Sequence, residues 1–72
     1  MSKKEVIKNI VQEYRQKLGM TQEELAQAVA VSRQTIIALE KGNYIPSVLL
    51  AIKLAKVFNT KVENIFALIY EK

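Results

Sequence analysis

The chain has 72 residues, half of them hydrophobic, and a net charge of +4 from eleven Lys and Arg against seven acidic residues. This length gives one small domain, near the lower limit for a self-sufficient core. There is no Cys and no His, so disulfides, thiolates and the commonest metal ligands and acid/base groups are missing. We therefore expect no enzyme, no bound metal and no cofactor, and the modest basic excess suits an anionic partner.

No apolar run in the sequence is long enough to cross a membrane. The longest strictly apolar stretches are VLLAI (48–52) and IFALIY (65–70), whereas a bilayer span needs roughly 20 residues. Lys3 and Lys4 are not followed by an apolar stretch, so no secretory signal is expected. These features predict a cytoplasmic protein, and a nucleoid-associated one if its partner is DNA.

Helix signals recur along the chain with almost no strand signals between them. Ser2 and Glu5 match a capping box at the start of a first helix, which Gly19 ends. The apolar residues between them fall on one helical face: Val6, Ile7, Ile10, Val11, Tyr14 and Leu18.

The next two predicted helices are short and closely spaced. Thr21 and Glu24 match a second capping box, and Ser32 is placed to cap a third helix that Gly42 ends. The residues expected to face inward are Leu25, Ala28 and Val29 in the second helix and Ile36 and Leu39 in the third. Because so few residues join these helices, they must cross at a large angle, which is the helix-turn-helix arrangement.

Two further helices complete the predicted all-α fold. A fourth begins at Pro46–Ser47, runs to about Val57 and is apolar on more than one side. Asn59 can adopt the left-handed conformation that ends it. Thr60 and Glu63 match a capping box for a short fifth helix.

The run TQEELAQAVAVSRQTIIALEKG resembles the helix-turn-helix of the phage-repressor and Cro (Xre-type) family of DNA-binding proteins. The resemblance extends upstream through YRQKLGMTQ and downstream through GNYIPSVLLAIKLAKVFNTKVENIF, over roughly residues 5–66. It implies one repressor-like domain of five helices over residues 1–72, with helices two and three forming the motif that binds double-stranded DNA. The family usually has glycine at a left-handed position of the turn, where this chain has Ala30; alanine there costs on the order of 1 kcal/mol.

The resemblance also implies which residues contact DNA. The first turn of the third helix would enter the major groove, which makes Ser32, Arg33, Gln34, Thr35 and Ile37 the candidates for base contacts. Arg can bind guanine bidentately, Gln can bind adenine, and Thr can meet an acceptor or a thymine methyl. The candidates for phosphate contacts are Gln22, Lys41, Asn43 and Tyr44. A solvated helix end is the alternative for the polar side chains, and packing against the fourth helix is the alternative for Ile37.

Arg15 and Glu40 are expected to form a structural ion pair. The family places an arginine of the first helix against the acid near the end of the recognition helix, and these residues match those positions. A partly buried pair would fix the recognition helix in place, although its net stabilisation can be near zero. Two separate surface roles are the alternative.

The C-terminal stretch 65–72 is more apolar than an exposed terminus should be. Its alternation fits a short strand that pairs with its symmetry mate, and the alternatives are a helix packed on the partner or a tail folded on its own core. One helix-turn-helix covers few base pairs, and the family usually works as dimers on half-sites roughly 34 Å apart. We therefore expect a homodimer with an interface at Ile65, Phe66, Leu68, Ile69 and Tyr70.

The leading functional hypothesis is a homodimeric, sequence-specific repressor that reads an inverted-repeat operator. The alternative from a different class is a protein-interaction module, such as a toxin-neutralising antitoxin, whose DNA binding is secondary or autoregulatory. Activation is a further alternative to repression, because Glu23 and Glu24 are placed to meet a polymerase.

Overall fold

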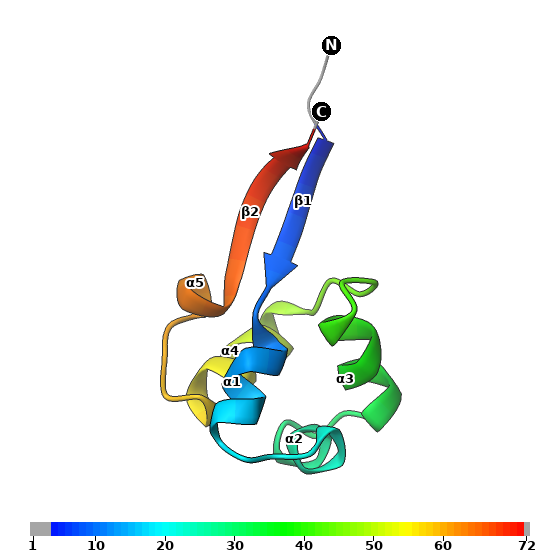
Figure 1. Cartoon of the computed structure of the whole chain (residues 1–72), viewed down its shortest axis with the longest axis vertical. Helices are drawn as coiled ribbons and strands as arrows, with labels where there is room; N and C mark the ends of the chain where they lie inside the picture. The colour runs from blue at the N-terminus through cyan, green and yellow to red at the C-terminus, as the bar shows by residue number, and fades with distance from the viewer. Residues whose placement is uncertain (1–3, 72) are drawn as a thin grey trace.

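The computed structural model describes residues 4–71, which form five helices and one two-stranded antiparallel sheet (Figure 1). In chain order the elements are β1 (Lys4–Asn9), α1 (Val11–Lys17), α2 (Gln22–Ala28), α3 (Arg33–Glu40), α4 (Val48–Val57), α5 (Val62–Ile65) and β2 (Phe66–Glu71). The helices gather in one body, and the β1–β2 ribbon projects from it (Figure 1). The five predicted helices are present, but the all-α prediction is wrong because the chain also forms a sheet. No helix within residues 4–71 is long and apolar enough to span a membrane.

The segment Lys4–Asn9 is a strand, although the sequence predicted a helix that starts there. The expected cap, Ser2, lies outside the described residues. β1 pairs antiparallel with β2, with Ile7 opposite Leu68. Val6 and Ile7 are β-branched and favour an extended chain once a partner strand supplies hydrogen bonds. That partner comes from the far end of the sequence, so the local capping pattern could not reveal it.

The C-terminal stretch is a strand, as predicted, and within the chain it pairs with β1. Ile65, at the end of α5, is buried, and Phe66 packs against the same core. Leu68 and Tyr70 lie further out on the ribbon and are exposed. The inner part of this stretch therefore belongs to the chain's own interior.

All five helices and their ends contribute to one apolar core. Its buried members are Val11, Leu25, Ala26, Val29, Ile36, Leu39, Leu50, Leu54, Ala55, Phe58 and Ile65. In α2, Leu25 and Val29 are buried as predicted, but Ala28 is exposed, so the prediction that it faces inward is wrong; Ala26 is buried in its place. The Tyr14 ring stacks on Phe58 with 5.2 Å between ring centroids, which joins α1 to the end of α4.

The fifth helix begins without the predicted capping box. Its N-cap is Lys61, which makes no side-chain cap. The helix thus begins one residue later than predicted, and the Thr60 hydroxyl accepts a hydrogen bond from Asn64 Nδ2 at 3.0 Å. Asn59, in contrast, has the predicted left-handed conformation, with φ of +53°.

Ala30 lies in the left-handed region, with φ of +60°, as the comparison with the family's glycine implied. We expect Ala30→Gly to stabilise the fold by about 0.5–1 kcal/mol, because relief of the Cβ clash outweighs the added freedom of the unfolded chain. Urea unfolding followed by circular dichroism measures this change. The matched control is Ala28→Gly, at an exposed helical position, which should destabilise by about 0.5–1 kcal/mol. Equal destabilisation by both variants would contradict the strain at Ala30.

Candidate nucleic-acid interface

The turn between α2 and α3 ends one helix and caps the next. Val31 N donates to the carbonyl of Ala26 at 3.0 Å, which closes the last turn of α2. Ser32 Oγ accepts from Thr35 N at 3.2 Å, which caps α3. Because Ala30 between them is left-handed, the chain reverses within the turn. Backbone geometry and the core therefore hold the two helices at a fixed angle, and the outward side chains of α3 are free for another role.

The first turn of α3 presents free hydrogen-bonding side chains to solvent. Arg33 and Gln34 are exposed, and within residues 4–71 neither side chain makes a hydrogen bond. The hydroxyls of Ser32 and Thr35 lie 3.0 Å apart and partly satisfy one another. Ile37 is half-buried, which agrees with partial packing. The guanidinium and the carboxamide are thus the groups most available to an external partner.

The starts of α2 and α3 face a common hollow. It has a volume of about 490 Å³ and is lined by Thr21, Gln22, Glu23 and Arg33. Gln22 and Arg33, which were expected to contact a phosphate and a base respectively, therefore lie on the same side of the α2–α3 unit. A single elongated partner can touch both.

The carboxylate of Glu40 connects the end of α3 to α1 and α2. Arg15 Nε donates to Glu40 Oε2 at 2.6 Å, and Arg15 Nη2 donates to Oε1 at 3.2 Å. Arg15 Nη1 also donates to the carbonyl of Met20 at 2.8 Å. The two charged side chains are only 11% and 4% exposed, so the expected pair is present and buried. It fixes the last turn of α3 against the helices on either side of the α1–α2 turn.

Gln22 has a partner that sequence reasoning missed. Its Nε2 donates to Glu40 Oε1 at 3.1 Å, and the side chain is half-buried. A carboxamide nitrogen carries two N–H groups, so one can hold Glu40 while the other meets a phosphate. Gln22 is therefore pre-oriented by the same carboxylate that binds Arg15.

Burial changes the charge balance of the α2–α3 unit. From sequence, residues 22–42 carry a net charge of −1 from two basic and three acidic residues, which are Arg33, Lys41, Glu23, Glu24 and Glu40. Glu40 is buried and is neutralised by Arg15 from outside this segment. The exposed side chains of the unit therefore carry no net charge. A net negative charge here would have repelled a polyanion such as DNA, and this repulsion is absent.

The loop after α3 carries the other predicted phosphate contacts. Lys41, Asn43 and Tyr44 are all exposed, at the opposite end of α3 from Arg33. Gly42 has φ of +81° and lets the chain leave the helix there. Candidate anion contacts thus lie at both ends of the candidate base-contacting helix.

Helix α4 has a second apolar face that the described part of the chain leaves uncovered. Its inner face is buried, whereas Val48 is 76% exposed, Leu49 64% and Ile52 45%, and Ile45 just before the helix is 73% exposed. We call Ile45, Val48, Leu49 and Ile52 the α4 outer face. A contiguous exposed apolar patch of this kind normally marks an interaction surface. The sequence of this helix is apolar on more than one side, whereas the dimer interface was expected at residues 65–70.

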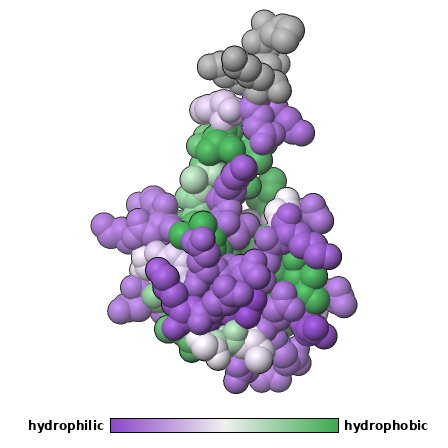
Figure 2. All heavy atoms as spheres, viewed as in Figure 1, coloured by the Kyte–Doolittle hydropathy of each residue, from purple (hydrophilic) through white to green (hydrophobic). Residues whose placement is uncertain are grey.

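The α4 outer face continues towards the ribbon. Ile45 and Leu68 line the same groove, of about 530 Å³, between the ribbon and the α3–α4 loop. In the view of Figure 2, hydrophilic side chains cover most of the helical body, and hydrophobic ones gather along the ribbon. Of the five predicted interface residues, the structure leaves Leu68 and Tyr70 exposed, places Ile69 half-buried and puts Ile65 and Phe66 in or against the core.

Comparisons with known proteins give one consistent family. The helix-turn-helix family model matches residues 11–65. An HTH-type transcriptional regulator of Archaeoglobus fulgidus is 57% identical over 56 residues, covering 78% of this chain and 80% of its own length. One from Methanocaldococcus jannaschii is 55% identical over 65 residues, covering 90% of this chain and 96% of its own length.

Solved structures agree with this match. The restriction-modification controller protein C.AhdI from Aeromonas hydrophila is similar with a TM-score of 0.70 and 26% identity, over 75% of this chain and 82% of that one. The transcriptional regulator VanUg has a TM-score of 0.73 over 93% of this chain and 89% of that one; at 20% identity it supports the fold alone.

Proposed function

We propose that this chain, which belongs to the helix-turn-helix family of DNA-binding transcriptional regulators, is a homodimeric repressor that reads an inverted-repeat operator. The family binds double-stranded DNA and is not enzymatic. The observation that supports base reading best is the pair of free side chains, Arg33 and Gln34, at the start of a helix whose other end is locked by Glu40. A DNA-binding regulator works where the chromosome is, so we place it in the cytoplasm, at the nucleoid.

In this proposal α2 and α3 are the helix-turn-helix, and α3 lies in the major groove. Arg33 and Gln34 supply bidentate contacts to bases, each worth about 1–3 kcal/mol of discrimination, with Ser32, Thr35 and Ile37 beside them. Phosphates lie at both ends of α3. The candidates that bind them are Gln22 beside the common hollow and Lys41, Asn43 and Tyr44 in the following loop.

A second copy of the chain is the partner that we assign to the α4 outer face. The four side chains that define this face are all apolar, with Lys53 and Lys56 one turn further along α4, and a symmetric dimer can bury the four around a two-fold axis. The groove shared by Ile45 and Leu68 extends the same surface to the ribbon. Two copies joined there would present two α3 helices, and recognition of two half-sites supplies the specificity that one helix lacks. A dimer seated on an operator represses by occupying the DNA that a polymerase needs.

Selection of binding sites from a random duplex library at physiological salt, with sedimentation of the same protein, tests this function. Enrichment of an inverted repeat with half-site centres about one helical turn apart, together with a dimeric mass, is the expected result. No enriched sequence from a folded protein would refute it. The α4 outer face would then be examined as the binding site of a different protein, as the antitoxin-like alternative requires.

Lys41 provides a test of the phosphate contacts. Lys41→Ala should weaken binding to operator and to unrelated duplex alike and should reduce the slope of log affinity against log salt by about 1. The control is Lys61→Ala, which removes the same charge from an exposed position at the start of α5. An unchanged slope for Lys41→Ala would remove this residue from the phosphate contacts.

A further inference from the structure

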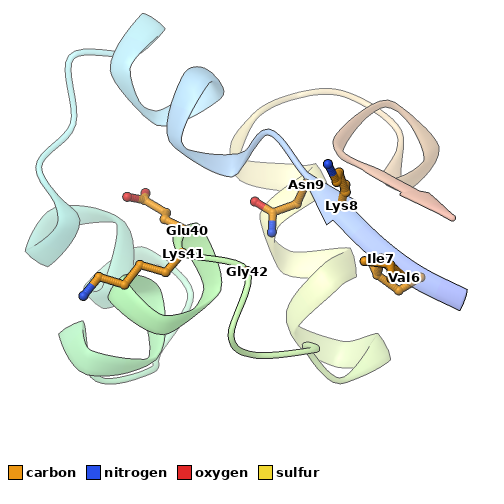
Figure 3. A pocket seen from close by; sticks show the side chains of 7 residues that line it. All are labelled: Val6, Ile7, Lys8, Asn9, Glu40, Lys41 and Gly42. Atoms are coloured by element: carbon orange, nitrogen blue, oxygen red, sulfur yellow. The ribbon is translucent and has the colours of Figure 1, made fainter. Parts of the chain in front are cut away.

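The side chain of Asn9, at the end of β1, makes hydrogen bonds in two directions. Its Oδ1 accepts from Val11 N at 3.1 Å, which satisfies one of the backbone N–H groups that the start of α1 leaves without a helical partner. Its Nδ2 donates to the carbonyl of Leu39 at 3.0 Å, in the last turn of α3. Figure 3 shows Asn9 pointing from the ribbon towards that turn. One side chain therefore joins the ribbon, α1 and α3.

The ribbon and α3 are otherwise separated by a pocket. It has a volume of about 320 Å³ and lies between two groups of residues, Val6, Ile7, Lys8 and Asn9 on β1 and Glu40, Lys41 and Gly42 at the end of α3 (Figure 3). Within residues 4–71 the bond from Asn9 is the only hydrogen bond between the ribbon and α3. The side-chain amide of Asn9 therefore supplies the hydrogen bond that joins the ribbon to α3. The two elements are not closely packed around this bond, because the pocket lies between them.

Two consecutive residues in the last turn of α3 are held from different sides. The carbonyl of Leu39 accepts from Gly42 N at 3.0 Å and from Asn9 Nδ2, so both of its lone pairs are used. The carboxylate of Glu40 is held by Arg15 and Gln22. In the first turn of α3, which we propose to read bases, Ile36 packs in the core and the polar ties are those of the cap at Ser32. The core and the α2–α3 turn set the place of this helix, and the polar ties at its far end restrict the tilt that remains.

We infer that Asn9 is a positioning residue for DNA recognition, whose amide fixes the last turn of α3 so that the first turn meets the bases at a defined angle. This inference rests on the proposed function and assigns the ribbon a part in it. Asn9 lies outside residues 11–65, the region that matches the family model. Through Asn9, the ribbon becomes the third element that holds the end of α3, in addition to α1 through Arg15 and α2 through Gln22.

The variant Asn9→Ser separates the two hydrogen bonds of Asn9. Serine retains an oxygen that can accept from Val11 N, but it is too short to reach the carbonyl of Leu39. The matched control is Asn64→Ser, which loses the bond from Asn64 Nδ2 to Thr60, in α5 and away from α3. Neither substitution changes the charge, so electrostatic attraction to DNA stays constant.

We expect Asn9→Ser to raise the dissociation constant for the selected operator by about five- to tenfold, because the last turn of α3 loses the hydrogen bond from Asn9 and the first turn then meets the bases at a less defined angle. Binding to unrelated duplex should change by less than twofold, and Asn64→Ser should change neither. A loss confined to stability would instead lower both kinds of binding in proportion to the unfolded fraction. An unchanged ratio of specific to non-specific affinity would overturn the inference.

Amide hydrogen exchange without DNA tests the tie directly. In Asn9→Ser the backbone amides of Lys41 and Gly42, which close α3, should exchange faster, while those of α2 keep their wild-type rates. Unchanged exchange at the end of α3 would show that the amide does not hold this turn. Failure of the wild type to enrich any sequence would refute the proposed function itself, whereas enrichment with unaltered Asn9→Ser binding would refute only the role of Asn9.

Discussion

Replacing Glu40 with alanine is expected to destabilise the fold by about 3–5 kcal/mol, because it leaves the guanidinium of Arg15 buried without its carboxylate. Gln22 loses its hydrogen-bond acceptor in the same change. A domain of 72 residues has a total stability of about 4–11 kcal/mol, so this loss is a large fraction of the whole. Urea unfolding followed by circular dichroism measures it.

The control for Glu40→Ala is Glu23→Ala, which removes the same charge from an exposed position on α2 and should change stability by less than about 0.5 kcal/mol. A double variant, Arg15→Met with Glu40→Leu, leaves no stranded charge and should recover most of the loss. Equal effects of Glu40→Ala and Glu23→Ala would contradict the buried pair. A double variant as unstable as the single one would mean that the pair itself, rather than the stranded charge, accounts for the stability.

The fold was predictable from sequence where the determining interactions are local. The pattern of Thr21 and Glu24 forms its capping box, with bonds of 2.8 and 3.0 Å, because both partners lie in one helical turn. The same pattern at Thr60 and Glu63 forms no capping box, because α5 begins one residue later, with Lys61 at the N-cap. The β1 strand was missed because its partner strand lies at the other end of the chain.

In the candidate site, too, residues close in sequence could be predicted and contacts between distant residues could not. Arg33 and Gln34 were identified from one continuous segment, and the structure leaves both free at the start of α3. The bonds from Gln22 to Glu40 and from Asn9 to Leu39 join residues distant in sequence, and no local pattern signals them. Both bonds hold the end of α3 opposite Arg33 and Gln34, so in the proposed function they would affect how bases are read rather than which side chains read them.

The dimer interface was expected in the tail because an apolar terminus is conspicuous in a sequence. The structure divides the tail: Ile65 is used by the chain's own core, whereas Leu68 and Tyr70 are exposed, and Leu49 on α4 is exposed as well. An apolar run such as 48–52 does not reveal which of its side chains face inward until the helix is packed.

Leu49→Lys is expected to convert the dimer into monomers with the mass of one chain, 8.2 kDa, because it places a charge in the α4 outer face. Affinity for the two-half-site operator should fall by about 10²–10⁴-fold, since the second half-site no longer benefits from a linked partner. The added lysine strengthens electrostatic attraction to DNA, so weaker binding would have to come from lost association. Sedimentation and operator titration measure the two effects separately.

Leu18→Lys is the matched control for Leu49→Lys, because Leu18 is exposed at the end of α1 and lies outside the α4 outer face. It should remain dimeric and bind the operator at least as tightly as the wild type. A persistent dimer in Leu49→Lys would place the interface elsewhere, and Leu68 in the adjoining groove would be substituted next. Monomers that bind the operator with unchanged affinity would show that one copy suffices, and two-fold reading of an inverted repeat would be wrong. The α4 outer face is supported as the dimer interface that brings two α3 helices to one operator only if Leu49→Lys loses both the dimer and the operator affinity.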